Sequence, residues 1–363
     1  MVSRRNILRG LAAAPLVGCG AAIDPSVDTS VDPSPYDSGS LPGTPREAGF
    51  RMPAEWEAHE RCVMAFPTAS DWLKGRELER ARTEWANTAN AVADFEPVTM
   101  VVNPGDDSAA AALLDPQIER VEIDINDAWT RDTAPLVLTD GAGNRSCASF
   151  GFNGWGHKQD YDKDAELKHH LAELLGLESW VIDAVLEGGA ISVNGAGLCV
   201  TTEQCMLHES RGLTDKDAWE QLLSESLGID KTIWLPVGIN PDPITDGHVD
   251  GICVFVDEGT VMVSTTDWEP DENYQPCRDA VEQLKGEGLD VIELLMGIQI
   301  LHINFYIANG GVIVPILGTD KEDDQPLAEI RNFFSDRTVV GVEASTISQL
   351  GGGIHCITQQ VPA

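Results

Sequence analysis

Lysine is scarce in this chain of 363 residues, with only eight copies. Lysine and arginine together number 24, against 59 aspartates and glutamates, so the formal net charge at pH 7 is −35. A protein so poor in cations repels nucleic acid and anionic lipid and attracts cations. The composition therefore excludes a nucleic-acid-binding protein. It is typical of a highly solvated surface, and it also fits a field that steers a cationic substrate.

Long apolar runs and several common site motifs are also missing. No stretch reaches the roughly 18 apolar residues of a membrane-spanning helix. The sequence has no Cys-x-x-Cys, no His-Glu-x-x-His and no histidine–cysteine cluster at zinc spacing, so we expect no structural metal. Its glycine runs lack the lysine of a phosphate-binding loop and the spacing of a dinucleotide fingerprint. What is present must therefore account for any chemistry with ordinary side chains.

The first 46 residues differ in composition from the rest. Residues 1–18 combine the pair Arg4-Arg5, in a twin-arginine export pattern, with a short apolar stretch, and LVGC at 16–19 resembles the site where bacterial lipoproteins are cleaved and acylated. Residues 19–46 are rich in proline, serine and aspartate and cannot fold alone. We predict an export signal at 1–18, lipidation of Cys19, a disordered tether at 19–46, and a protein anchored at the cell envelope through that lipid only.

Seven cysteines remain beyond Cys19, an odd number, so at least one thiol stays free or pairs outside the chain. Cys199 and Cys253 lie within apolar, strand-like runs and are typical of small core residues. Cys356 is different, because it follows three consecutive glycines at 351–353. Glycine runs allow the backbone to approach a neighbour closely, so Cys356 is the candidate for chemistry.

From residue 47 to residue 363, helix-like and strand-like stretches alternate. Apolar residues recur at helical spacing between 78 and 92, and a β-rich run follows at 97–102. Strands that alternate with helices predict an α/β domain, and quasi-repeated units indicate radial or stacked repetition. No internal linker interrupts the pattern, so we predict one domain over 47–363. Four further passages repeat the order of helix and strand: 167–182, 219–235, 280–293 and 327–342.

Three loops carry side chains suited to catalysis. TDGHVD at 245–250 precedes an apolar strand, and in an extended chain His248 and Asp250 would project to the same face. NDAWTRD at 126–132 gathers an aromatic ring, a cation and carboxylates, and LEGGA at 186–190 places an acid before paired glycines. Each pattern alone is equally typical of an ordinary surface turn or a salt-bridged loop.

Together these residues indicate a cationic substrate. Cysteine, histidine and aspartate also occur in thiol proteases, but a protease aims donors at an oxyanion, which clustered carboxylates would oppose. A guanidinium is planar and has five N–H donors that carboxylates bind in pairs. Its central carbon then remains open to attack by a thiolate.

The motifs, taken in order, resemble the agmatine deiminase and bacterial (Porphyromonas-type) peptidylarginine deiminase family of guanidine-modifying enzymes. The resemblance implies a five-bladed α/β propeller (pentein) with pseudo-fivefold symmetry around a central site, in agreement with the five units. It implies neither a metal nor an organic cofactor. It is carried by MPAEWE at 52–57, WTRD at 129–132, FNGWG at 152–156, EGG at 187–189, DGHVD at 246–250, NFYIANGG at 304–311 and the run 351–360.

The resemblance also implies the catalytic roles. Cys356 is the nucleophile, His248 the proton shuttle, and Asp132 and Asp250 clamp the guanidinium. Attack by the thiolate gives a covalent amidino-cysteine intermediate that water then releases. A thiol ionises at neutral pH only beside a positive charge, which the bound guanidinium or protonated His248 supplies. The implied substrate-binding residues are Trp129, Asp132, Glu187, Asp250 and Gly353.

The implied reaction is hydrolysis of agmatine to N-carbamoylputrescine and ammonia, a step of polyamine biosynthesis toward putrescine. No arginine or lysine cluster beyond Arg131 is evident near the motifs to seat an α-carboxylate, which favours agmatine over free arginine. Export favours an alternative, deimination of arginine in proteins. A second alternative is a non-catalytic lipoprotein that captures cations, and the sequence is compatible with an oligomer in each case.

Two departures from the family pattern concern recognition of the far end of the substrate. After TTE at 201–203 the chain reads QCMLHESRG, where agmatine deiminases have a loop rich in asparagine and arginine. Leu301-His302 stands where a Ser-Tyr pair is expected. The implied chemistry is intact, and the choice among agmatine, peptidylarginine and another guanidine stays open.

Overall fold

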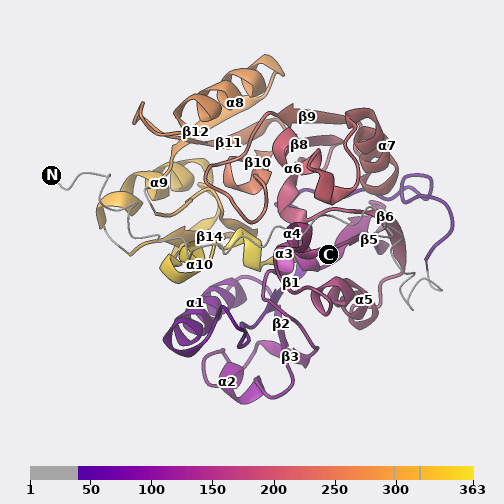
Figure 1. The fold of residues 1–363 in the computed structure, drawn as a ribbon, viewed down its shortest axis with the longest axis vertical. Coiled ribbons are helices and arrows are strands. Elements are labelled where there is room, and N and C mark those ends of the chain that lie inside the picture. Colours follow the sequence, from indigo (N-terminus) through magenta and orange to yellow (C-terminus); the bar gives the residue numbers. More distant parts are fainter. Residues whose placement is uncertain (1–39, 298, 319) are drawn as a thin grey trace, which may run out of the picture. The chain divides into compact units, whose positions relative to one another are not determined.

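A computed structural model describes residues 40–297, 299–318 and 320–363 (Figure 1). The predicted export signal at 1–18, the lipidation site Cys19 and the tether as far as residue 39 lie outside these residues. Among the described residues, no helix combines the length and the apolar content that crossing a membrane requires.

The last part of the predicted tether belongs to the folded unit. The backbone N–H of Leu41 donates to the carbonyl oxygen of Ser179 at 3.0 Å, and the Leu41 side chain packs against a buried apolar cluster. Arg46 forms an ion pair with Asp230. The compact unit therefore starts before residue 47, because a few anchoring contacts hold a segment whose composition alone indicates disorder.

The described part of the chain folds into short strands and helices. The strands are β1 His59–Ala65, β2 Val98–Val102, β3 Glu119–Glu122, β4 Leu136–Thr139, β5 Arg145–Gly151, β6 Ser179–Val185, β7 Ile191–Val193, β8 Leu198–Thr202, β9 Lys231–Leu235, β10 Cys253–Asp257, β11 Thr260–Thr265, β12 Asp290–Leu295, β13 Tyr306–Ala308, β14 Gly311–Ile316, β15 Thr338–Glu343 and β16 Gln359–Pro362. The helices are α1 Gly75–Ala93, α2 Asp107–Ala111, α3 Thr130–Thr133, α4 Gly154–His157, α5 Asp164–Leu174, α6 Glu203–Met206, α7 Lys216–Leu227, α8 Tyr274–Gly286, α9 Asp320–Phe333 and α10 Ser345–Gln349. Short 3₁₀ turns are η3 Gly188–Ala190, η4 Glu209–Arg211, η5 Val249–Gly251 and η6 His355–Ile357.

These strands form five small sheets of one design. Their orders are β4-β5-β6, β7-β8-β9, β10-β11-β12, β13-β14-β15 and β16-β1-β2-β3. In each sheet the first two strands pair antiparallel and the third lies parallel to the second. A parallel pair needs a crossover, and α1, α5, α7, α8 and α9 supply it. The predicted α/β class and all five predicted helix-then-strand passages are confirmed.

The first helix illustrates how apolar spacing builds these units. Leu78, Ala81, Trp85, Ala89 and Val92 are all buried along one side of α1, because residues three or four apart share a helix face. The helix packs that side against α10, β14 and β15. In Figure 1 the five crossover helices lie toward the margin of the folded unit, with α3, α4 and α6 near its middle.

The cysteines divide into two groups. All seven described cysteines are free thiols, and only Cys356 is not fully buried. Cys199 and Cys253 are completely enclosed in strands β8 and β10, so the prediction that they are core residues is confirmed. The remaining buried thiols are Cys62, Cys147, Cys205 and Cys277.

A short turn precedes the first strand of most sheets, and these turns meet one another. Helix α3 precedes β4, η3 precedes β7, η5 precedes β10 and η6 precedes β16. Helix α3 contacts both η3 and η6, and η3 contacts η5. The repeated topology thus gathers segments from four sheets at one place.

One sequence prediction about these turns is wrong. His248 and Asp250 do not share an extended strand, because Val249–Gly251 forms a 3₁₀ turn and the strand begins at Cys253. The residue before the turn, His248, is extended, with φ −50° and ψ 144°. Gly247, which precedes His248, has φ 87°, a conformation that favours glycine and that interrupts the extended chain just before the turn.

Candidate active site

Cys356 lies in η6 beside an amide and a carboxylate. Its Sγ is 3.4 Å from Asn304 Oδ1 and 3.6 Å from Asp250 Oδ2. Asn304 Oδ1 also accepts the backbone N–H of Cys356 at 3.3 Å, and Asn304 Nδ2 donates to the Asp250 carbonyl at 3.3 Å. Asn304 therefore ties the thiol to Asp250. Asn304 was not predicted as a site residue, and its sequence signal was its place at the start of the motif NFYIANGG.

The glycines before Cys356 make room for two neighbours. A Cβ on Gly352 would lie 2.3 Å from the Trp129 indole, and a Cβ on Gly353 would lie 2.3 Å from Asn304 Oδ1. Real Cβ atoms do not approach so closely, so a side chain at either position would force a shift. The sequence predicted that the run lets the backbone approach a neighbour closely, without identifying the neighbour. The structure identifies two such neighbours, Trp129 and Asn304.

Three of the predicted catalytic side chains face one point above Gly189. A Cβ at Gly189 would lie 2.6 Å from His248 Nδ1, 3.0 Å from Asp250 Oδ2 and 3.2 Å from Asp132 Oδ1. These residues come from η3, η5 and α3, so the convergence is a product of the tertiary fold. The paired glycines at 188–189, a weak signal in the sequence, leave open the space between the three side chains.

Asp132 is held by neutral donors. Trp155 Nε1 donates to Oδ2 at 2.9 Å, and the backbone N–H of Gly189 donates to Oδ1 at 3.0 Å. Burial is the main cause that raises the pKa of Asp132 above its usual value, and the carboxylates of Glu187 and Asp250 add to it against the opposing charge of His248. The predicted pocket residue Trp129 is nearly buried, 7% exposed.

Asp250 is held by a histidine. His355 Nδ1 lies 2.9 Å from Asp250 Oδ2, and His355 Nε2 lies 3.0 Å from Glu55 Oε2. Burial favours a raised pKa, but the hydrogen bond and charge of His355, helped by His248, outweigh it and lower the pKa of Asp250. Neither His355 nor Glu55 was predicted as a site residue. Their signal was their position within the motifs 351–360 and 52–57.

His248 lies between two acids. Its Nδ1 is 4.0 Å from Asp132 Oδ1 and its Nε2 is 3.9 Å from Glu187 Oε2. Burial disfavours the imidazolium, but the charge of Asp132 and the contacts with Cys205 and Glu187 outweigh it, and the pKa of His248 is raised well above its usual value. The acidic neighbours of His248 therefore favour its imidazolium form.

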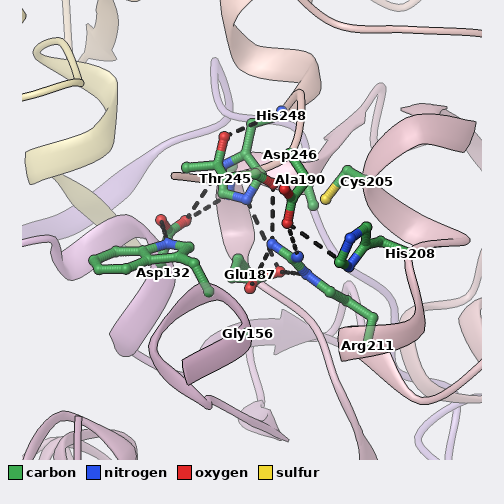
Figure 2. Close-up of polar contacts among 12 residues, drawn as sticks. Asp132, Gly156, Glu187, Ala190, Cys205, His208, Arg211, Thr245, Asp246 and His248 are labelled. Carbon is green, nitrogen blue, oxygen red and sulfur yellow. Dashed lines mark hydrogen bonds and ion pairs between the residues drawn. The ribbon is translucent and has the colours of Figure 1, made fainter. Parts of the chain in front are cut away.

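Arg211 connects this cluster to a second acid, as Figure 2 shows. Its fully buried guanidinium lies 3.1 Å from Glu187 Oε1 and 2.5 Å from Asp246 Oδ2. Lys158 Nζ also contacts Asp246 at 2.6 Å. Arg211 was not predicted as a site residue. Its only sequence signal was its place in the loop after residue 203, which departs from the family pattern. Arg211 fixes Glu187 beside His248.

The cations near the motifs are all paired with acids. Besides Arg131, two cations that the sequence analysis did not single out approach the site, Arg211 and Lys158. Arg131 itself points away from the Gly189 point, toward Gln360 Oε1 at 2.7 Å and Glu55 Oε2 at 3.5 Å. Among the described residues, each of these three cations already has a carboxylate partner.

Glu187, Cys205 and His248 place an oxygen, a sulfur and a nitrogen within 4.8 Å of one another. These atoms are of the kinds that bind zinc. The Arg211 guanidinium, however, lies 3.1 Å from Glu187, and a cation there opposes a second one. The arrangement is better described as an ion-pair cluster around His248.

The thiol of Cys356 is electrostatically disfavoured as an anion. Burial and the charges of Asp250 and Asp132 raise the pKa of Cys356 well above its usual value. A cation between the two aspartates would reverse the effect of both charges. The site is therefore an acidic, buried space with an unionised thiol at its edge, and a bound cation would activate that thiol.

Comparisons with known proteins identify the family to which the chain is similar. The family model described as Porphyromonas-type peptidyl-arginine deiminase matches residues 51–362. The agmatine deiminase of Pseudomonas aeruginosa is 36% identical over an alignment 366 residues long, gaps included. The alignment covers 88% of this chain and 97% of that protein. The agmatine deiminase of Stutzerimonas stutzeri is also 36% identical, over 365 residues, covering 89% and 98%.

Solved structures are similar as well. The Enterococcus faecalis agmatine deiminase superposes with a TM-score of 0.84 at 31% identity, covering 89% of this chain and 99% of that one. A cysteine-to-serine variant of the C. jejuni agmatine deiminase with substrate bound gives a TM-score of 0.81 at 27% identity, covering 86% and 96%.

Proposed function

This chain belongs to the Porphyromonas-type peptidyl-arginine deiminase family, and we propose that it hydrolyses agmatine to N-carbamoylputrescine and ammonia. The observation that carries the proposal is the convergence of Asp132, Asp250 and His248 on one point above Gly189, with Cys356 Sγ 3.6 Å from Asp250. Two buried carboxylates are suited to a planar cation with several N–H donors. The agmatine deiminases of similar sequence and structure support this choice of guanidine.

Substrate binding activates the nucleophile. The guanidinium lies between Asp132 and Asp250 and donates N–H bonds to both. Its charge offsets the two carboxylates that keep the Cys356 thiol protonated, so the thiolate forms only when substrate is bound. Asn304, which accepts from the Cys356 N–H at 3.3 Å, holds the sulfur beside the planar carbon.

His248 moves the protons. The thiolate of Cys356 attacks the guanidinium carbon and forms a C–S bond. The His248 imidazolium gives its proton to one amino group, the C–N bond breaks, and ammonia leaves with an amidino-cysteine behind. Neutral His248 then takes a proton from water, whose oxygen attacks the same carbon, and the C–S bond breaks to give the ureido product. The proton that Cys356 loses when the thiolate forms leaves with ammonia as ammonium, and the second proton of the water returns to the Cys356 sulfur as the C–S bond breaks, which restores the resting thiol.

Glu187 and Arg211 keep His248 in place for these transfers. Glu187 lies 3.9 Å from His248 Nε2 and is bound on its other side by Arg211. Because Arg211 neutralises Glu187, the cluster supports a cationic His248 without an unpaired buried charge. The proton needed for the leaving group is thereby present before the substrate arrives.

The far end of the substrate distinguishes agmatine from arginine. Free arginine carries an α-carboxylate that needs a cationic partner. Among the described residues near the motifs, Arg131, Arg211 and Lys158 are all engaged by acids. Agmatine carries a second cation instead, and the net charge of −35 attracts a dication. The product would feed the formation of putrescine in polyamine biosynthesis.

The activity assay measures ammonia and the ureido product from agmatine, free arginine and an internal arginyl peptide. We expect kcat/KM for agmatine to exceed that for arginine by at least about a hundredfold, because an unpaired buried charge costs roughly 3 kcal/mol. A larger value for the peptide would favour deimination of proteins. No ammonia from any of the three would identify a binding protein.

The covalent step has its own test. Cys356→Ser should fold and bind agmatine while losing turnover, because a hydroxyl is far harder to ionise than a thiol. Acid trapping of the intact enzyme during turnover should add the amidino group to the peptide that holds Cys356. Appreciable turnover by Cys356→Ser would contradict the covalent route.

Two further features extend the proposal. The five sheets share one arrangement of three strands, to which one sheet adds a fourth strand, and this repetition supports a propeller with pseudo-fivefold symmetry. The N-terminal motifs support export and lipidation at Cys19, in residues outside the structure. Mass spectrometry of the native N-terminus should find a modified Cys19, and an intact start at Met1 in a soluble cytosolic fraction would contradict it.

A further inference from the structure

His355 stands directly before the nucleophile, yet no step above uses it. His355 lies in η6, and its side chain is 8% exposed. Backbone bonds on both sides fix its position. The His355 N–H donates to the Asn304 carbonyl at 3.0 Å, and Arg131 Nε donates to the His355 carbonyl at 3.2 Å. A histidine held this firmly beside a substrate-binding carboxylate calls for a physical role.

Each ring nitrogen of His355 faces a carboxylate. Nδ1 lies 2.9 Å from Asp250 Oδ2 and Nε2 lies 3.0 Å from Glu55 Oε2. An ionised carboxylate only accepts hydrogen bonds, so both nitrogens carry a proton and the ring is an imidazolium. Burial and the charge of Arg131 oppose that form, but Glu55 and Asp250 outweigh them, and the pKa of His355 is raised.

Glu55 completes the arrangement from the opposite side. Its Oε1 accepts the N–H of Ile307 at 2.8 Å, and its Oε2 also lies 3.5 Å from Arg131. Burial alone would raise its pKa, but His355 and then Arg131 lower the pKa of Glu55 to about 2. Glu55 is therefore a permanent anion that balances the His355 charge, so the pair adds no net cation to a site that must bind one.

Resting on the proposed guanidine hydrolysis, we propose that His355 is a positioning residue, an imidazolium held between Glu55 and Asp250 that orients the Asp250 carboxylate toward the guanidinium and keeps it ionised. Without this cation, Asp250 would share a buried space with Asp132. Like charges in such a space favour protonation of one of them. His355 thus allows both carboxylates to be anions when substrate arrives.

The pH dependence follows from all the charged groups around this pair. His355 faces Asp250, Glu55 and Arg131. Asp250 is influenced by His355, His248 and Arg131 and lies beside Cys356. Removal of the His355 charge leaves His248 and Arg131 in place, so the pKa of Asp250 should rise without reaching that of an isolated buried acid.

The test compares two alkylating reagents at Cys356 and needs no turnover. In each reaction the thiolate forms a C–S bond and displaces a halide, chloride from cationic 2-chloroacetamidine or iodide from neutral iodoacetamide. The ratio of the two rates cancels thiol ionisation and reports the anionic clamp. The ratio is the 2-chloroacetamidine rate divided by the iodoacetamide rate, measured as a function of pH. His355→Phe should lower this ratio about tenfold at neutral pH and move the acid limb of its pH profile about one pH unit higher. An unchanged ratio and limb would overturn the proposal.

Two more variants separate charge from geometry and from folding. His355→Gln keeps an N–H donor toward Asp250 but has no charge, so its acid limb should remain shifted. Return of the limb to the wild-type position would show that hydrogen bonding suffices and would overturn the charge role. The matched control is His59→Phe, which breaks another buried pair, with Glu96 at 3.1 Å. It should lower the melting temperature and leave the limb in place.

The outcomes of this test and of the activity assay are independent. If agmatine is not hydrolysed but the alkylation ratio responds as expected, the proposed substrate is wrong and the role of His355 stands. If agmatine is hydrolysed and the ratio does not respond, the reverse holds. Should His355→Phe fail to fold, Glu55→Gln, which removes the distant carboxylate, should move the limb in the same direction by less. No shift in that variant would overturn the proposal.

Discussion

Asp132 and Asp250 face the same point above Gly189 but are held in opposite ways. Asp132 accepts from an indole at 2.9 Å and a backbone amide at 3.0 Å, both neutral. Asp250 accepts from His355 at 2.9 Å. The pKa of Asp132 is raised, chiefly by burial, whereas in Asp250 the contact with His355 outweighs burial and the pKa is lowered.

The comparison shows that burial does not by itself set the charge of a carboxylate. Both side chains are almost inaccessible, 5% exposed in Asp132 and 7% in Asp250. Dipoles orient a carboxylate but compensate its charge only in part, while a cation compensates it fully. Asp250 is thus the carboxylate of the clamp that its protein partners keep ionised. The charge of Asp132 is compensated less by the protein, so the arriving guanidinium stabilises the Asp132 anion most.

The largest effect is expected from removing the charge of Asp250, the clamp carboxylate that is bound by a cationic histidine. Asp250→Asn should lower kcat/KM for agmatine by about a thousandfold, because loss of one member of a buried ion pair costs about 3–5 kcal/mol. Asp132→Asn should cost less, about a hundredfold, because its hydrogen-bond donors are neutral and its cationic neighbour His248 lies 4.0 Å away. Steady-state kinetics on both variants checks the order, and a larger loss for Asp132→Asn would contradict the asymmetry.

A second change disturbs the site without altering either carboxylate. Gly352→Ala places a Cβ 2.3 Å from the Trp129 ring and 3.2 Å from Cys356 Cβ. Displacement by about 1 Å should lower kcat about a hundredfold. Gly259→Ala is the control, since nothing lies within 4 Å of its added Cβ. Wild-type kcat in Gly352→Ala would refute the steric reason for that glycine.

A smaller effect is expected from weakening the neutral side. Trp155→Phe removes the N–H that Asp132 Oδ2 accepts, so kcat/KM should fall about tenfold and the pKa of Asp132 should rise further. Trp219→Phe also loses indole hydrogen bonds, to the carbonyls of Met206 and Leu213. Neither acceptor belongs to the two clamp carboxylates, so this variant should retain activity. Equal losses in the two variants would indicate general destabilisation only.

The smallest effect is in the wild-type pH profile. Because the pKa of Asp132 is raised and that of Asp250 is lowered, Asp132 takes up a proton first as pH falls. The two carboxylates share one buried space and titrate as a coupled pair, so the acid limb of kcat/KM depends on both and should lie above the usual aspartate value of about 4. His248 acts as an acid, and its raised pKa should place the alkaline limb above about 6.5. An acid limb unchanged in Asp132→Asn would assign it to another group.

Much of the fold was predictable because its signals are local. Apolar spacing in α1 and the β-rich run at 98–102 depend on neighbours a few residues away, and five such passages were found. The resemblance to known motifs supplied Cys356, His248, Asp132 and Asp250, and all four come together in the structure. Local pattern failed at Val249–Gly251, where a turn set by Gly247 replaced the expected strand.

By itself, the sequence determined the α/β class and the five helix-and-strand units, since these depend on local periodicity, while its resemblance to known motifs indicated the residues of the site. Only the tertiary structure decided which partner each acid has. Asp250 and His355 are 105 residues apart in the chain, and Glu55 and His355 are 300 apart. No periodic signal spans such separations. The ionisation of the two aspartates was therefore fixed by the packing of five sheets, which brings these distant turns into hydrogen-bonding contact.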